Sequence, residues 1–234
     1  MPLAAGAGTW TVSVGPVTLP DLLHGLDLAG VFANALLGGA MARRYGFDPV
    51  GFGALAIVSG LGGGIIRDTL LQRGTPVALT DYTYLVTALV GAGVAFVLPV
   101  RGRAWERSFP FVDALALGCW AATGAQKTLL LGLGWLPAVL LGTVTAVGGG
   151  VVRDLCVAQV PRIFGGNTLY ATCALLASGV MVAMQVAGLA HSGPLVATLV
   201  GAALTLLARW RGWILPEGID VRRRRRKDRG SDGR

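Results

Sequence analysis

The stretch GLGGGIIRD, residues 60–68, holds three consecutive glycines and an Arg-Asp pair, and it recurs as AVGGGVVRD at residues 146–154. The similarity extends beyond the motif, because residues 27–93 align with residues 113–179 at one constant offset and without a gap. Self-similarity at a fixed offset indicates an internal repeat. The sequence therefore predicts two copies of one structural unit.

The composition is typical of a membrane protein. Hydrophobic residues make up 53% of the chain, charged residues make up 14%, and the mean hydropathy is +0.64. A helix needs about 20 mostly apolar residues to cross ~30 Å of bilayer hydrocarbon. We therefore expect an all-α membrane protein with seven transmembrane helices. The predicted helices span residues 22–42, 50–72, 82–100, 111–131, 137–158, 168–190 and 194–211.

Each repeat contains three predicted helices, so the second copy enters the membrane with the opposite orientation. This arrangement is an inverted 3+3 repeat, related by a pseudo-two-fold axis in the membrane plane, followed by a seventh helix. The predicted organisation is an N-terminal extension (1–21), a first repeat (22–107), an inverted second repeat (108–193), the seventh helix (194–211) and a basic tail (212–234).

Basic residues are unevenly distributed among the loops. Arginines follow the first, third and fifth predicted helices, whereas the loops after the fourth and sixth contain no Lys or Arg. The positive-inside rule then predicts an integral membrane protein with the N-terminus outside and the C-terminus in the cytoplasm. The tail carries RRRRRK at residues 222–227. A short Arg cluster after the last span is typical of an orientation anchor, so we expect no nucleic-acid partner.

The two glycine triplets are candidates for a bend in a pathway. Gly62, Gly63 and Gly64 correspond to Gly148, Gly149 and Gly150. Consecutive glycines let a helix bend or break and leave its carbonyl groups approachable. The alternative is close packing, since Gly60 and Gly64 also form a GxxxG pair. Because the triplet recurs in both repeats with a charged pair behind it, we favour the pathway.

Five ionisable residues fall within or at the edge of the apolar segments. Such residues are costly unless paired or hydrated, and they often mark ion or substrate routes. Either they line a pore, or the Arg of one repeat pairs with the Asp of the other. For the single lysine among them, the alternatives are a buried polar cluster and a side chain that reaches the membrane surface. These residues are Arg67, Asp68, Lys127, Arg153 and Asp154.

Neutral polar residues in the predicted spans could face the same pathway. Asn34, Gln126, Thr143 and Thr145 offer oxygens to a passing ion. A threonine hydroxyl, however, also bonds back to its own helix. We take the four as candidate pore-lining residues.

Two aspartates and three tyrosines occupy suggestive places. Asp27 and its counterpart Asp113 either attract cations or stabilise a helix N-terminus. For Asp113 the second interpretation is stronger, because it lies three residues after Pro110. We interpret the tyrosines first as aromatic residues of the membrane interface and second as gate residues. They are Tyr82, Tyr84 and Tyr170.

The sequence lacks the motifs of several enzyme classes. It contains no nucleophile elbow, no HExxH and no phosphate-binding GxxxxGK[ST], and His24 and His191 lie near opposite ends of the chain. The three cysteines show no metal-binding spacing. We expect no catalysis, no cofactor and no structural metal.

Two GGGxxRD motifs, on the second and fifth helices of a three-plus-three-plus-one protein, resemble the prokaryotic branch of the trimeric intracellular cation (TRIC) channel family. The resemblance covers roughly residues 22–211. It implies a homotrimer among the lipids of the prokaryotic inner or cell membrane. Each protomer would contain a pore for monovalent cations, chiefly K⁺, which would be bound only in transit. The resemblance also matches Lys127 to a lysine that takes part in lipid and gating interactions in animal relatives. Their KEV motif is replaced here by RD.

The resemblance and the residues lead to one hypothesis. Cations pass between the repeats, and carbonyl and side-chain oxygens at a waist replace part of their hydration shell. The alternative is a secondary transporter of a small solute such as an amino acid, since inverted repeats with broken helices suit alternating access. A non-conducting scaffold is a third interpretation, and it leaves the interior charges unexplained.

Overall fold

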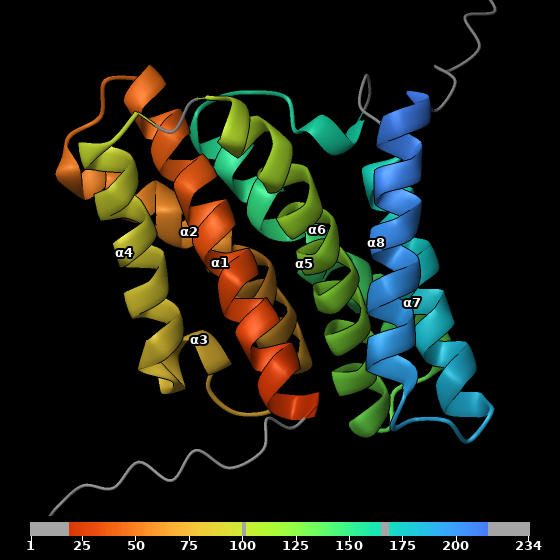
Figure 1. The fold of residues 1–234 in the computed structure, drawn as a ribbon. Helices are drawn as coiled ribbons and strands as arrows, with labels where there is room; N and C mark the ends of the chain where they lie inside the picture. Colours follow the sequence, from red (N-terminus) through yellow and green to blue (C-terminus); the bar gives the residue numbers. More distant parts are fainter. Residues whose placement is uncertain (1–18, 100–101, 165–168, 215–234) are drawn as a thin grey trace, which may run out of the picture.

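The computed structural model describes residues 19–99, 102–164 and 169–214, and seven long helices dominate this part of the chain (Figure 1). A short helix, α3 (Val77–Thr80), follows the second of them, and a 3₁₀ turn, η1 (Arg162–Phe164), follows the fifth. The long helices are α1 (Leu19–Arg44), α2 (Pro49–Leu71), α4 (Tyr82–Val97), α5 (Arg103–Leu130), α6 (Trp135–Cys156), α7 (Tyr170–Val186) and α8 (Gly193–Arg211).

Each predicted segment overlaps one long helix, so the expectation of an all-helical membrane protein is confirmed. Four helices, α1, α2, α6 and α8, are long and apolar enough to cross a membrane. Helices α4 and α7 are shorter but apolar. Helix α5 has a charged first part that contains Arg103, Glu106 and Arg107.

The start of α5 differs from the prediction and changes the interpretation of Asp113. The apolar pattern predicts a helix from residue 111, whereas α5 begins at Arg103. Polar residues can form the first turns of a helix, and hydropathy does not register them. Asp113 therefore lies in the helix interior, and the prediction that it stabilises the helix N-terminus was wrong.

Local sequence signals explain several helix ends. The Asp48 carboxylate accepts a hydrogen bond from the Gly51 N–H, and Pro49 occupies the first position of α2. Asp81 caps α4 in the same manner through the Thr83 N–H. Both are common N-terminal arrangements.

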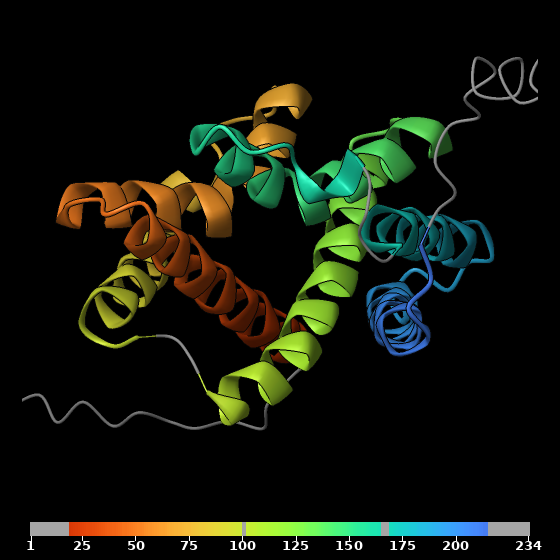
Figure 2. The same cartoon turned by 90° about the horizontal axis from the view of Figure 1, so that it is seen from above.

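The helices form two groups that meet at α2 and α6. Helices α1, α2 and α4 pack on one another, as do α5, α6 and α7, and α8 packs on α5 and α7. Seen from above, α4, α2 and α1 lie on one side of α5, while α7 and α8 lie on the other (Figure 2). The two groups also contact each other through α1 and α5.

Small side chains fill much of the core. Ala35, Ala56, Ala88, Ala121 and Ala177 are fully buried, and most large apolar side chains of the outer face are exposed. Helices in a membrane associate through close packing of small residues, because lipid tails are as apolar as leucine. This packing brings backbones close together at the centre of the molecule.

Candidate functional site

Two cavities lie along the contact between the two helix groups. Cavity A has a volume of about 110 Å³ and its lining includes Ile163 of η1 and Arg209 of α8. Cavity B has a volume of about 370 Å³ and its lining includes Val77 of α3. The C-terminal end of α8, which carries Arg209, and helix α3 lie at opposite ends of the molecule in Figure 1. The two cavities therefore extend toward opposite ends.

Three residues line both cavities. They are Gly60 of α2, Trp120 of α5 and Thr145 of α6. Trp120 is a large buried side chain, and a Cβ atom added to Gly60 would lie 2.9 Å from the Val31 carbonyl oxygen. We call these three residues the shared layer, because they belong to the lining of both cavities.

The glycine triplets bring α2 and α6 into contact beside the shared layer. A Cβ atom added to Gly62 would lie 3.2 Å from the Cα of Gly149, and one added to Gly148 would lie 3.1 Å from the Cα of Gly63. The repeat relates these two contacts to each other, because Gly62 corresponds to Gly148 and Gly63 corresponds to Gly149. The triplets therefore let two backbones approach without intervening side chains.

Backbone oxygens occupy the space beside the middle glycines. A Cβ atom on Gly63 would overlap the Thr145 carbonyl oxygen, and one on Gly149 would overlap the Ser59 carbonyl oxygen. Both helices run through their triplets without interruption. Neither helix is broken at its triplet and the glycines pack closely, while the predicted bend at the triplets stays a prediction.

The last glycine of each triplet faces a different environment. Gly64 lines cavity B and Gly150 lines cavity A. The nearest atoms to an added Cβ are the Arg67 guanidinium at 3.9 Å and the Arg153 guanidinium at 3.7 Å. These positions have ordinary room for a methyl group, unlike the middle glycines.

Asp68 is the centre of the charged cluster in cavity B. Its Oδ1 accepts from Arg67 Nε at 2.8 Å and from Lys127 Nζ at 2.7 Å. Its Oδ2 accepts from the Val77 N–H at 3.0 Å. Asp68 is buried, whereas the Lys127 side chain is 35% exposed. Lys127 therefore joins α5 to α2 as a half-buried ion pair and lines the cavity.

Arg153 and Asp154 form the corresponding pair in cavity A. Arg153 Nη2 lies 2.7 Å from Asp154 Oδ1, and both side chains are buried. The same arginine donates to Ser59 Oγ of α2 at 3.4 Å. Each motif arginine thus pairs with the next residue, instead of the cross-pairing between repeats that the sequence suggested. Within the described part of the chain, the Lys127–Asp68 ion pair crosses between the helix groups.

Asp27 and Asp113 each bind a tyrosine. Tyr84 donates to Asp27 and Tyr170 donates to Asp113, at 2.5 and 2.9 Å, and both pairs are 57 residues apart. Both hydroxyls thus donate to a carboxylate inside the protein, and the assignment of these tyrosines to the membrane interface stays a prediction. Tyr82, by contrast, is 78% exposed.

The second donor differs between the two aspartates. Asp27 accepts from Trp120 Nε1 at 2.5 Å, whereas Asp113 accepts from Arg209 Nη2 at 3.3 Å. Sequence reasoning missed Trp120, Ser59 and Arg209. The repeat offset contained a signal for the first two, because Trp120 corresponds to Asn34 and Ser59 to Thr145. Arg209 lies outside the repeat and had no such signal.

Replacing Tyr84 by phenylalanine is expected to reduce the free energy of unfolding by about 1.5–3 kcal/mol, because a hydrogen bond to a charged group is lost. Tyr82→Phe removes the same hydroxyl from an exposed neighbour and should leave stability unchanged. Thermal unfolding of the purified protein in detergent measures both. Equal melting temperatures for the two variants would show that the Asp27 hydrogen bond contributes nothing.

Three of the four neutral polar candidates line a cavity. Asn34 lines cavity A, Gln126 lines cavity B, and Thr145 lines both. Asn34 and Thr145 also bond back to their own helices, at the Gly30 and Leu141 carbonyls. Thr143 bonds back as well, to Val139, and it is outside the lining of both cavities.

The sequence matches one family model and several bacterial membrane proteins. A family model described as Glycine transporter matches residues 24–99 and 110–186. A UPF0126 membrane protein of Deinococcus radiodurans is 39% identical over 201 residues, which cover 84% of this chain and 92% of the relative. The UPF0126 inner membrane protein YadS of Escherichia coli is 34% identical over 192 residues, covering 80% and 90%.

Solved structures of TRIC channels resemble this chain. One is a TRIC cation channel whose structure was solved to explain its conductance. It superposes with a TM-score of 0.78 at 30% identity, and the match covers 84% of this chain and 97% of the channel. The TRIC orthologue from Rhodobacter sphaeroides gives a TM-score of 0.70 at 31% identity, covering 82% and 96%. The likeness therefore extends over almost the whole of each channel.

Proposed function

Because the chain belongs to the prokaryotic TRIC channel family, whose family model is described as Glycine transporter, we propose that it conducts monovalent cations, K⁺ among them, through a pore within each protomer. The observation that carries this proposal is the pair of cavities that extend toward opposite ends and have the shared layer in both of their linings. An ion that enters one cavity reaches the other by passing Gly60, Trp120 and Thr145.

The charges of the two cavities are balanced. Arg67 and Lys127 face Asp27 and Asp68 in cavity B. Cavity A is lined by two basic and two acidic residues in the same way, Arg153, Arg209, Asp113 and Asp154. Positive side chains alone would repel a cation, and carboxylates within a few ångströms offset that repulsion. We therefore expect cation flow with weak discrimination among monovalent ions.

We also propose the inverted 3+3 repeat with a seventh helix. Contacts at the repeat offset support it, namely the tyrosine–aspartate pairs and the glycine contacts between α2 and α6. The boundaries follow the sequence, with repeats at 22–107 and 108–193, the seventh helix at 194–211, and flanking segments 1–21 and 212–234. The segments 1–18 and 215–234 lie outside the described residues.

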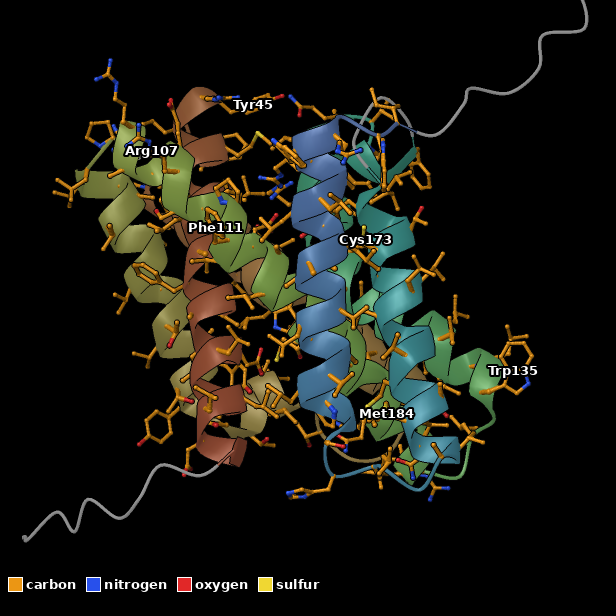
Figure 3. The ribbon with its side chains drawn as sticks, turned by 45° about the vertical axis from the view of Figure 1, so that its right-hand side comes forward. Tyr45, Arg107, Phe111, Trp135, Cys173 and Met184 are labelled. Atoms are coloured by element: carbon orange, nitrogen blue, oxygen red, sulfur yellow. The ribbon has the colours of Figure 1, made fainter. Side chains whose placement is uncertain are left out.

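A homotrimer in a lipid membrane is proposed for the assembly. The Rhodobacter relative is named a trimeric channel, and the outer face of this chain carries large apolar side chains such as Phe111 and Trp135 (Figure 3). Tyr45 and Arg107 lie at one end of the molecule, with Trp135 toward the other. By the positive-inside rule, the end with Arg107 faces the cytoplasm.

Single-channel recording in planar bilayers tests the function. We expect purified protein in KCl to give discrete current steps that reverse near the K⁺ equilibrium potential in a salt gradient. A Gly149→Leu variant, whose side chain would fill the contact between α2 and α6, serves as the control and should be silent. Steps of equal size from both proteins would place the current outside the proposed pathway.

The second candidate is a transporter of a small amino acid, favoured by the description of the family model. Uptake of labelled glycine into vesicles distinguishes it from a channel. Saturable uptake together with silent bilayers would replace the channel proposal. Current steps without saturable uptake would support the channel.

A further inference from the structure

The seventh long helix, α8, contributes a charge to cavity A although it has no counterpart in the repeat. Arg209, in its last turn, lines cavity A, and its Nη2 lies 3.3 Å from Asp113 Oδ2. The Asp113 side chain is buried, and that of Arg209 is 37% exposed. The Arg209 guanidinium thus lies beside the Asp113 carboxylate, at a position to which that carboxylate would otherwise attract a passing cation.

Close packing fixes the register of α8 against α5. A Cβ atom on Gly201 would lie 2.9 Å from the Cα of Gly118, and one on Gly118 would overlap the Thr198 carbonyl oxygen. Contacts between backbones leave little freedom to slide. Since Gly118 and Asp113 share one helix, as do Gly201 and Arg209, this contact positions the guanidinium at the carboxylate.

The corresponding carboxylate in cavity B has a different second partner. Asp27 accepts from the neutral indole N–H of Trp120 and from the Tyr84 hydroxyl. Asp113 accepts from the Tyr170 hydroxyl and from a guanidinium. A neutral donor leaves the charge of a carboxylate in place, whereas a guanidinium cancels most of it at a distance. The two cavities therefore differ in how their equivalent aspartates act on an ion.

We propose that Arg209 determines conductance and ion selectivity by masking Asp113 in cavity A. This inference rests on the proposed cation channel. With Arg209 present, cavity A has two basic and two acidic lining side chains, and without it one negative charge is in excess. Cations then accumulate in cavity A and anions are repelled from it.

Recordings of Arg209→Gln at two salt concentrations test the proposal. At about 50 mM KCl we expect K⁺ conductance to rise roughly two- to fivefold over the wild type. At about 1 M KCl the Debye length falls to roughly 3 Å, so the difference should largely disappear. In a KCl gradient, the reversal potential of the variant should move toward that of K⁺.

Arg211→Gln is the matched control. Arg211 lies two residues further along α8, and its guanidinium lies over the Trp210 ring instead of in the cavity. Removal of this charge should leave conductance and reversal potential at wild-type values. Arg209→Lys keeps the charge and should also behave like the wild type. Gel filtration of every variant establishes that the assembly is intact.

Several results would overturn the proposal. Equal conductance of Arg209→Gln and Arg211→Gln at low salt would contradict the masking of Asp113 by Arg209 without contradicting the channel function. A rise in current that persists at high salt, with no change in reversal potential, would indicate a wider pore instead of an exposed charge. If the wild-type protein gives no cation current, both the proposed function and this inference are contradicted. The double variant Arg209→Gln/Asp113→Asn should return to wild-type conductance.

Discussion

Gly63→Leu and Gly149→Leu are each expected to abolish cation current and to reduce the free energy of unfolding by about 3 kcal/mol or more. Each added side chain would begin inside the van der Waals radius of a backbone carbonyl oxygen, on Thr145 or on Ser59. A backbone oxygen cannot rotate away as a flexible side chain can. The two helices would have to separate, which deforms the shared layer.

Alanine variants make this test sharper. Gly63→Ala and Gly149→Ala meet the same oxygens, so we expect a smaller loss of stability and altered current. Gly64→Ala and Gly150→Ala have room for the methyl group and gain helix propensity worth about 1 kcal/mol. Bilayer recording and thermal unfolding measure all four. Wild-type current and stability in Gly63→Ala and Gly149→Ala would contradict the close contact between α2 and α6.

Asp68→Asn is expected to lower K⁺ conductance roughly five- to tenfold at low salt. The substitution leaves Arg67 and Lys127 without the carboxylate that both contact, so cavity B gains a net positive charge. A cation that enters this cavity then meets repulsion. The effect should shrink at high salt, because mobile ions screen the exposed Lys127.

Asp81→Asn is the control for this prediction. Asp81 caps α4 near the same end of the molecule, lies outside the lining of both cavities, and can be replaced by asparagine, which caps a helix equally well. Its current should match that of the wild type. A second variant, Asp68→Asn/Lys127→Gln, removes the excess charge and should recover much of the conductance. Equal currents from Asp68→Asn and Asp81→Asn would exclude a role for the Asp68 charge.

The helices could be predicted because hydropathy is a local property. Every long helix follows an apolar run, and helix starts such as Pro49 after Asp48 agree with local capping signals. The start of α5 could not be found in this way, since Arg103, Glu106 and Arg107 are polar. The register between α2 and α6 is a tertiary property, but the repeated glycines did indicate where the two helices meet.

The charged residues of the candidate site could be predicted, whereas their pairing could not. Arg67, Asp68, Lys127, Arg153 and Asp154 all line a cavity. Which cation binds which carboxylate depends on distances that a linear sequence does not contain. The alternative that the motif residues pair across the repeats was wrong, because an adjacent Arg and Asp already reach each other within one helix turn.

The shared layer has an electrical consequence. Moving one elementary charge through 100 mV corresponds to about 2.3 kcal/mol. Where water and ions fill cavities A and B, the potential in each is close to that of the solution at its mouth, so the voltage falls mainly across Gly60, Trp120 and Thr145. A blocking ion driven in from either side should therefore sense a steep field only at this layer, and its apparent electrical distance should change abruptly there.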